Sequence, residues 1–384
     1  MMGDKKRIFL ASPHMSEEGY EMKYIEEAFA TNWIAPLGEN VNGFEAEMCD
    51  VTGANEALAL SSGTAAMHMA LKLVGAGEGD IVFCQSLTFS ATVNPVLYEN
   101  AEPVFIDSDT ETWNMSPKAL EEAFMKYESI GKLPKAVIVV HLYGLAADMD
   151  KIMDICRRYG VPVIEDAAES LGTLYKGRMT GTFGDMGIVS FNGNKIITSS
   201  GGGMLLFNGN DSKEKKEKAL FWSTQARDRA RYYQHSELGY NYRMSNIVAG
   251  IGRGQLKVLE ERVNKKREIY EFYKKAFEKI SDICMMPIHD EIERSNCWLS
   301  CMLISEASKV TPLDVQLALE SDDIEARPVW KPMHMQPIFE KYDYIDNGGI
   351  SERLFRRGVC LPSDTKMDGT DLRRITDIII GLWK

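Results

Sequence analysis

Short apolar runs alternate with longer amphipathic stretches between Ala57 and Phe207. Seven runs have the length and composition of buried strands: Ala57–Leu60, Ile81–Phe83, Pro103–Ile106, Ala136–Val140, Pro162–Glu165, Gly187–Phe191 and Gly203–Phe207. Strand-like runs that alternate with amphipathic segments are typical of a largely parallel sheet covered by helices. We therefore predict an α/β fold built on one open, mostly parallel, seven-stranded sheet.

The pattern changes after this region. From Ser245 to Ile280, apolar residues recur at helical spacing among many charged ones, which predicts one or two long helices. The remainder mixes further elements, of which the clearest are Trp298–Ile304 as a strand and Pro312–Glu320 and Gly369–Leu382 as helices. We predict a large domain over residues 1–250, followed by a connecting helix and a smaller C-terminal α+β domain over residues 251–384.

Composition narrows the function classes. The chain has 384 residues, 45% of them hydrophobic, so it can bury a large core. Its formal net charge of −12 disfavours general binding to nucleic acid, which needs a basic field. Seven cysteines without paired spacing indicate reduced thiols, a cytoplasmic protein and no metal site. No apolar run is long enough to suggest a membrane span.

The first candidate for chemistry is Lys195, on a turn between two predicted strands. A lysine in such a place can form an imine with an aldehyde cofactor. Asp166 follows another predicted strand, and a carboxylate there can keep a pyridine nitrogen protonated. Each residue also has an ordinary explanation, because most lysines are solvated and aspartate commonly caps helices. Together they predict pyridoxal 5'-phosphate (PLP) as the cofactor.

A phosphate site is predicted where an apolar run enters a Ser/Gly/Thr turn and an Ala-rich helix follows. Free N–H groups at the start of a helix attract anions. Gly63, Thr64 and Ala65 are the expected contacts, and Ser190 can add a hydroxyl. Phe89 can stack on the pyridine ring. The ordinary alternatives are a capped helix without a ligand and a phenylalanine that packs in the core.

In their order along the chain, these motifs resemble the DegT/DnrJ/EryC1/StrS family of PLP-dependent nucleotide-sugar aminotransferases. The segments that carry the resemblance are Ser62–Ala65, Asp166–Glu169, Ser190–Lys195 and Gly239–Arg243, within a stretch from Pro13 to His334. The resemblance implies the aspartate aminotransferase-like fold, known as fold type I. The residues within these motifs look closest to those of enzymes that aminate C4 of a UDP-linked 4-keto-6-deoxy-N-acetylhexosamine, on routes to bacillosamine-type sugars. The resemblance implies L-glutamate as the amine donor.

The resemblance also implies roles for individual residues. Lys195 would bind the cofactor and move protons, Asp166 would pair with its pyridine nitrogen, and Glu169 would contact its phenolic edge. Many relatives carry Gln or His where Glu169 stands here. Gly63, Thr64, Ala65 and Ser190 would hold the phosphate. Asn241 would reach the phosphate of the neighbouring subunit, so the resemblance implies a homodimer with shared active sites.

Substrate contacts are implied at positions spread along the chain: His14, Asn32, Trp33, Ile34, Ala35, Asn194, Arg243, Arg327, Trp330 and His334. The arginines can serve an anionic sugar nucleotide. Tryptophans at such positions more often pack, and single arginines more often lie at the surface.

Four alternatives stay open with different weights. A C3 aminotransferase acting on a dTDP- or UDP-linked 3-keto sugar fits the same motifs. Sugar dehydratases related to the family carry histidine in place of the lysine, so Lys195 disfavours dehydration. A PLP-binding regulator without catalysis is disfavoured, because no helix-turn-helix or basic DNA-facing segment is evident. A nicotinamide enzyme is disfavoured, because no G-x-G-x-x-G opens a helix after a strand.

Overall fold

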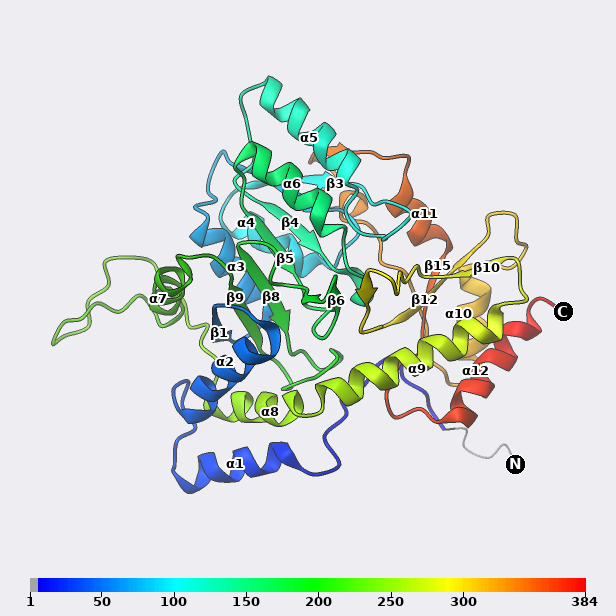
Figure 1. The fold of residues 1–384 in the computed structure, drawn as a ribbon, viewed down its shortest axis with the longest axis horizontal. Helices are drawn as coiled ribbons and strands as arrows, with labels where there is room; N and C mark the ends of the chain where they lie inside the picture. The colour runs from blue at the N-terminus through cyan, green and yellow to red at the C-terminus, as the bar shows by residue number, and fades with distance from the viewer. Residues whose placement is uncertain (1–5) are drawn as a thin grey trace.

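A computed structural model describes residues 6–384, and Figure 1 shows them arranged around one central sheet. The strand order in this sheet is β1-β9-β8-β5-β4-β2-β3-β14. The bounds are β1 Glu56–Leu60, β2 Ile81–Gln85, β3 Glu102–Ile106, β4 Val137–Val140, β5 Val163–Asp166, β8 Met186–Ser190, β9 Gly203–Phe207 and β14 Tyr344–Ile345. Only β9 runs antiparallel to its neighbours, β1 and β8.

The predicted fold class is confirmed, and all seven expected strands are present. The eighth strand, β14, comes from the C-terminal part of the chain and pairs with β3 at the sheet edge. Two residues are too few to produce a period in the sequence, so this strand could not be predicted. The other strands read as continuous apolar runs because helices cover the sheet on both faces.

The helices on the two faces pack against alternate residues of the same strands. On one face, Leu58 and Leu60 of β1 join a core with α3, α4 and α7. On the other face, Ala57 and Ala59 pack with α2 and the end of α8, while α5 and α6 cover the strands further along. The bounds are α2 Glu39–Thr52, α3 Gly63–Leu73, α4 Asn94–Tyr98, α5 Pro117–Ser129, α6 Met149–Tyr159, α7 Ser212–Ser223 and α8 Asn246–Leu256.

The expected long helices are α8 and α9 (Leu259–Phe277), which run across the lower part of the molecule in Figure 1. The N-terminal helix α1 (Tyr20–Ala30) packs on α8. Small residues permit this contact: a Cβ on Gly254 would lie 2.5 Å from the backbone nitrogen of Glu21. Among residues 6–384, no helix combines the length and apolar character that a membrane span needs.

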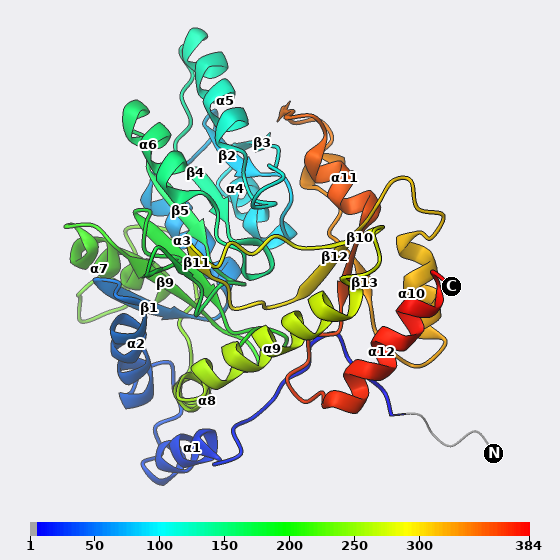
Figure 2. The same ribbon diagram turned by 45° about the vertical axis from the view of Figure 1, so that its right-hand side comes forward.

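The C-terminal part builds a second, antiparallel sheet in the order β10-β12-β15-β13, and Figure 2 shows it beside α10 and α12. The bounds are β10 Ile283–Met285, β12 Ser300–Ile304, β13 Arg327–Pro328, β15 Gly358–Leu361, α10 Pro312–Glu320, α11 Ile350–Arg357 and α12 Gly369–Gly381. A small third sheet pairs β11 (Glu293–Arg294), β6 (Leu174–Tyr175) and β7 (Arg178–Met179). The domain division between residues 250 and 251 falls inside α8 and stays a prediction.

Candidate active site

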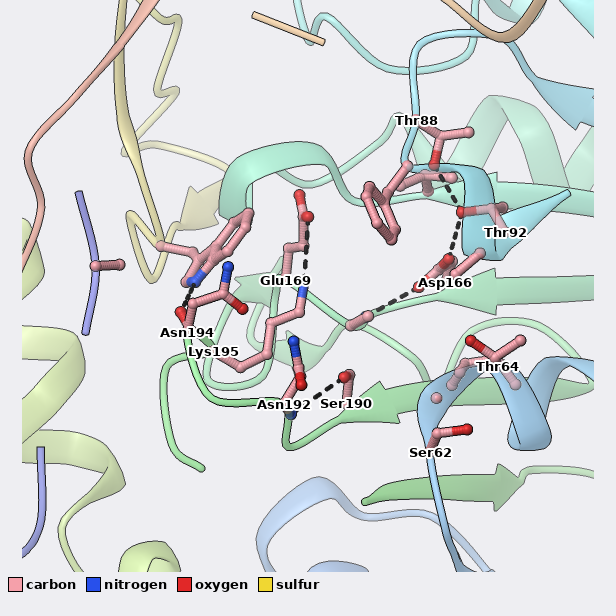
Figure 3. Close-up of a pocket in the computed structure, with 18 of the residues that line it drawn as sticks. Ser62, Thr64, Thr88, Thr92, Asp166, Glu169, Ser190, Asn192, Asn194 and Lys195 are labelled. Carbon is pink, nitrogen blue, oxygen red and sulfur yellow. Dashed lines mark hydrogen bonds and ion pairs between the residues drawn. The ribbon is translucent and has the colours of Figure 1, made fainter. Parts of the chain in front are cut away.

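A cavity of about 700 Å³ lies beyond the carboxyl ends of β5 and β8. Ligands of open α/β sheets gather at this end of the strands. Asp166 is the last residue of β5 and Ser190 the last of β8, and both line the cavity. The C-terminal part contributes Trp298, Arg327 and Trp330 to the wall. Figure 3 shows the polar side chains of this cavity.

Asp166 is held in place by hydrogen bonds to both carboxylate oxygens. The hydroxyl of Thr92 donates to Oδ2 at 2.7 Å, and the backbone N–H of Ala168 donates to Oδ1 at 3.1 Å. The hydroxyls of Thr88 and Thr92 are 2.7 Å apart, so a short chain of hydroxyls leads to the carboxylate (Figure 3). A carboxylate oxygen accepts more than one hydrogen bond. Asp166 can therefore accept a further N–H from a ligand in the cavity.

Lys195 lies on the loop after β8, in a turn closed by its own N–H to the carbonyl of Asn192. Its Nζ is 3.3 Å from Oε1 of Glu169, the contact dashed in Figure 3. The same Nζ lies 4.2 Å from the ring centroid of Trp298, within cation–π range. The side chain of Lys195 is 12% exposed and that of Glu169 4%. The amine is thus held at the cavity wall by one carboxylate and one indole.

Glu169 has an unusual electrostatic environment. Burial raises its pKa to about 7, although the charge of Lys195 and the N–H of Tyr143 act in the opposite direction. That N–H donates to Oε2 at 2.8 Å. A carboxyl with this pKa changes protonation near neutral pH, so it can exchange a proton with the adjacent amine.

The turn before α3 has the backbone geometry that suits an anion. Ser62 caps the helix: its hydroxyl accepts from the N–H of Ala65 at 3.0 Å, and its carbonyl accepts from Ala66. The N–H groups of Gly63 and Thr64 open the helix and have no partner within it. A Cβ on Gly63 would lie 3.2 Å from Cβ of Ser190, so glycine lets this turn approach the Ser190 hydroxyl.

Together these groups fit PLP. The helix start and Ser190 suit a phosphate, Asp166 suits a protonated ring nitrogen, and Lys195 suits an aldehyde. The cavity brings together ten of the predicted residues: Gly63, Thr64, Phe89, Asp166, Glu169, Ser190, Asn194, Lys195, Arg327 and Trp330. Phe89 and Trp330 lie side by side with ring centroids 5.4 Å apart. Ala65 lies outside the wall, and its N–H is taken by Ser62.

Three other predicted residues contact protein groups away from this cavity. Arg243 forms a buried ion pair with Glu45 and donates to the carbonyl of Ala59. His334 is 2.7 Å from the hydroxyl of Ser86 and stacks on Tyr344. His14 bonds to Thr365 and lines a much smaller cavity, which also borders Lys195.

The predicted residues Asn32, Trp33, Ile34, Ala35 and Asn241 lie on surface segments. Trp33 and Ile34 are about half exposed. Asn241 accepts from the side-chain amide of Gln225 at 3.1 Å. It bridges to Thr224 at the base of an arm, residues 224–241, that projects after α7 (Figure 1). None of them lines the cavity that the described chain forms by itself. Their roles toward a neighbouring subunit or a substrate stay predictions.

Sequence reasoning missed several groups that touch the central side chains. Thr92 reaches Asp166 from a short 3-10 turn (Ser90–Thr92), and the backbone N–H that meets Glu169 belongs to Tyr143 in another such turn (Leu142–Gly144). Trp298 precedes β12 and contacts Lys195 from the C-terminal part of the chain. No local pattern pointed to them, because each lies far along the chain from its partner.

The comparisons with known proteins agree with this geometry. The profile of the DegT/DnrJ/EryC1/StrS aminotransferase family matches residues 15–380. The chain is 52% identical to the "Putative pyridoxal phosphate-dependent aminotransferase EpsN" of Bacillus subtilis (strain 168), over 98% of this chain and 96% of that protein.

Other relatives carry names of nucleotide-sugar enzymes. The GDP-perosamine synthase of Escherichia coli O157:H7 is 37% identical over 90% of each chain. The UDP-4-amino-4,6-dideoxy-N-acetyl-beta-L-altrosamine transaminase of Campylobacter jejuni (strain NCTC 11168) is 35% identical, also over 90% of each chain. The crystal structure of a DegT DnrJ EryC1 StrS aminotransferase from Brucella abortus superposes with a TM-score of 0.87, at 29% identity and 95% coverage of both chains.

Proposed function

Because the chain belongs to the DegT/DnrJ/EryC1/StrS aminotransferase family, we propose that it transfers an amine from L-glutamate to a UDP-linked 4-keto-6-deoxy-N-acetylhexosamine. The product is the corresponding UDP-linked 4-amino-4,6-dideoxy sugar, for use in glycan biosynthesis. The observation that carries the proposal is the meeting of Lys195, Asp166 and the anion site at the start of α3 in one cavity. The resemblance found in the sequence is confirmed, and the family and the similar proteins named above favour catalysis over a non-catalytic regulator.

The cofactor is pyridoxal phosphate, which when bound carries the amine and withdraws electrons from the reacting carbon. Gly63, Thr64 and Ser190 hold its phosphate. Asp166, fixed by Thr92 and Ala168, accepts the ring N–H and favours its protonated form.

Lys195 is the proposed proton carrier. Its amine takes the proton from the α-carbon of the amino donor and delivers one to the acceptor carbon. Glu169 lies 3.3 Å from this amine and accepts or returns a proton as the amine changes charge. The ring of Trp298 limits the movement of the Lys195 side chain and shields this side chain from solvent. The donor and the sugar bind in turn, because each reacts at Lys195 in the same cavity.

The substrate proposal rests on the sequence resemblance and on the relatives. The Campylobacter relative's name specifies a UDP-linked 4-amino-4,6-dideoxy sugar, which supports UDP and position C4. The perosamine relative's name specifies GDP, so the nucleotide is the part of the proposal that most needs a direct test. Arg327, with a 64% exposed side chain at the cavity wall, is the proposed contact to the diphosphate.

We also propose a homodimer with shared active sites. The segment predicted to contact the substrate carries exposed apolar side chains, Trp33 and Ile34, and the nearby Leu37 is exposed as well. The arm after α7 exposes Tyr232 and Tyr233, at 70% and 80%. Exposed apolar groups gathered on projecting segments mark interaction surfaces. Asn241 lies at the base of this arm, paired with Thr224 in an isolated bridge.

Two experiments test the function. Borohydride reduction of the protein isolated with PLP should add the mass of the reduced cofactor to the peptide that contains Lys195, and Lys195→Ala should neither gain this mass nor turn over. Exposed Lys176 supplies the matched control, since Lys176→Ala should keep both properties. Turnover by Lys195→Ala at the wild-type rate would refute the proposal.

The second experiment identifies the product. The enzyme is incubated with L-glutamate and a panel of UDP-, GDP- and dTDP-linked 3-keto and 4-keto sugars, and the products are analysed by NMR. Amination at C4 of the UDP-linked 4-keto sugar supports the proposal. Preference for a GDP-linked sugar, or an amine at C3, would replace the proposed substrate while leaving the aminotransferase in place.

A further inference from the structure

Two thiols face each other at the edge of the cavity. Cys301 of β12 and Cys360 of β15 are register partners in the antiparallel pair, so their side chains point to the same side of the sheet. Their Sγ atoms are 3.5 Å apart, and both residues are at most 1% exposed. The other five cysteines are also free thiols.

The two thiols differ in access. Cys360 lines the cavity and Cys301 does not, so a small solute that enters the site reaches Cys360 before Cys301. Cys301 lies behind it, and burial, together with the contact to Cys360, raises the pKa of its thiol well above the ordinary range. Oxidation of such a pair therefore starts at Cys360, with Cys301 as the resolving partner.

We propose that Cys301 and Cys360 form a reversible disulfide when a hydroperoxide enters the active-site cavity. The sulfur of Cys360 attacks a peroxide oxygen, the O–O bond breaks, and the sulfur becomes a sulfenic acid as one water leaves. The sulfur of Cys301 then attacks this oxidised sulfur, and the S–S bond forms as the second water leaves. Two thiols and one hydrogen peroxide thus give one disulfide and two waters, with the sulfurs oxidised by two electrons.

The geometry makes this step accessible. Bond formation brings the sulfurs to about 2.05 Å, a shift of about 1.5 Å that rotation of directly opposed side chains can supply. The closed loop runs from residue 301 to residue 360 and contains the Arg327–His334 stretch proposed for substrate binding. Arg327 is the register partner of Cys360 on the other side, in β13. Oxidation therefore links β12 covalently to β15, the strand that pairs with the strand of Arg327.

Peptide mapping tests the crosslink. The reduced holoenzyme is treated with hydrogen peroxide, the remaining thiols are alkylated, and the non-reduced tryptic digest is searched for a peptide that joins residues 295–309 to residues 358–366. Because the first peptide also contains Cys297, Cys297→Ser is the matched control. The crosslink should form in the wild type and in Cys297→Ser, be absent in Cys301→Ser and disappear with dithiothreitol. A peptide linked through Cys297, or oxidation of other thiols without this crosslink, would overturn the proposal.

Thermal unfolding supplies the second readout. A disulfide that closes a long loop restricts the unfolded chain, so the oxidised wild type should unfold several degrees above the reduced protein. Cys360→Ala cannot form the bond, so its unfolding midpoint should not rise on oxidation. This variant replaces Cys301→Ser as the control if Cys301→Ser folds poorly. An unchanged thermal unfolding midpoint in a fully crosslinked protein would show that the disulfide does not stabilise this loop. Neither readout requires amine transfer, so the result is independent of the proposed function.

Discussion

Glu169 and Lys195 show how one contact between two residues sets the properties of the site. The carboxyl of Glu169 is buried beside the amine that we propose carries protons in the reaction, and its other oxygen accepts from a backbone N–H. Burial favours the neutral acid, while the amine favours the carboxylate. Glu169 therefore gains or loses a proton near neutral pH, whereas a glutamine at this position would not titrate.

The first prediction concerns the pH dependence of stability. The folded pKa of Glu169 is about 7, above its ordinary value of 4.5. Between these values the native protein holds a proton that the unfolded chain has lost, so the free energy of unfolding falls as pH rises from 4.5 to 7, by about 3 kcal/mol at most. Glu169→Gln should lack this decline. Urea unfolding of both cofactor-free proteins across this range measures it, and parallel curves would contradict the assignment.

The second prediction concerns Thr92, whose hydroxyl donates to Asp166 inside the protein. Thr92→Val keeps the shape of the side chain but removes the hydrogen-bond donor. A hydrogen bond to a charged group contributes about 2 kcal/mol to stability. Thr88→Val is the matched control, because the Thr88 hydroxyl bonds to that of Thr92 and not to Asp166. Its loss should lower the free energy of unfolding by about 1 kcal/mol. PLP affinity should fall in Thr92→Val and stay near the wild-type value in Thr88→Val. Equal losses in both variants would show that the hydroxyl chain acts only in packing.

At the scale of elements, α9 links the cavity to the small C-terminal sheet. Lys266 extends from this helix into the interior and donates to the carbonyls of Trp298 and Ser363, at 2.7 and 2.9 Å. The first carbonyl belongs to the residue whose ring contacts Lys195. One buried side chain thus ties the connecting helix to a loop that lines the main cavity and to a second loop beside the smaller one.

The third prediction follows from that burial. Burial lowers the pKa of Lys266 to about 8, although Asp364 opposes the shift. Between pH 8 and the ordinary value of 10.5 the unfolded chain holds a proton that the native protein has lost. This group therefore makes the free energy of unfolding rise with pH, by about 3 kcal/mol at most. Lys266→Met should lose the rise, whereas Lys265→Met, on the more exposed side of the same helix, should keep it. Denaturant unfolding at pH 8 and pH 10 distinguishes the two.

At the scale of the whole molecule, the single chain builds a cavity but leaves several predicted contacts outside it. The segments that carry Asn241 and Trp33 are exposed, and one of them projects from the body of the molecule. In a symmetric dimer the same surface serves both subunits, so each projecting arm can complete the partner's site.

The fourth prediction is complementation between inactive variants. Under the proposed shared sites, Lys195→Ala disables a chain's own site, whereas Asn241→Asp puts a negative charge next to the phosphate in the partner's site. In an equal, re-equilibrated mixture about half of the dimers are mixed, and one of their two sites is intact, so about a quarter of wild-type activity should return. Mixing Lys195→Ala with Asp166→Asn is the control and should restore none, since both changes damage the chain's own site. Failure of the first mixture to recover would contradict shared sites.

The sequence by itself determined the seven main strands and the long helices. It also singled out Lys195, Asp166 and the turn at Gly63 as candidates for one site. Strand and helix periods, and the turns that end them, are local properties of the chain, and residues at the carboxyl ends of neighbouring strands must meet. Only the tertiary structure decided that Thr92 holds Asp166, that Trp298 and Glu169 confine Lys195, and that Arg243 lies in a buried pair with Glu45. These contacts join residues distant in the sequence, and their geometry depends on how helices and sheets pack against one another.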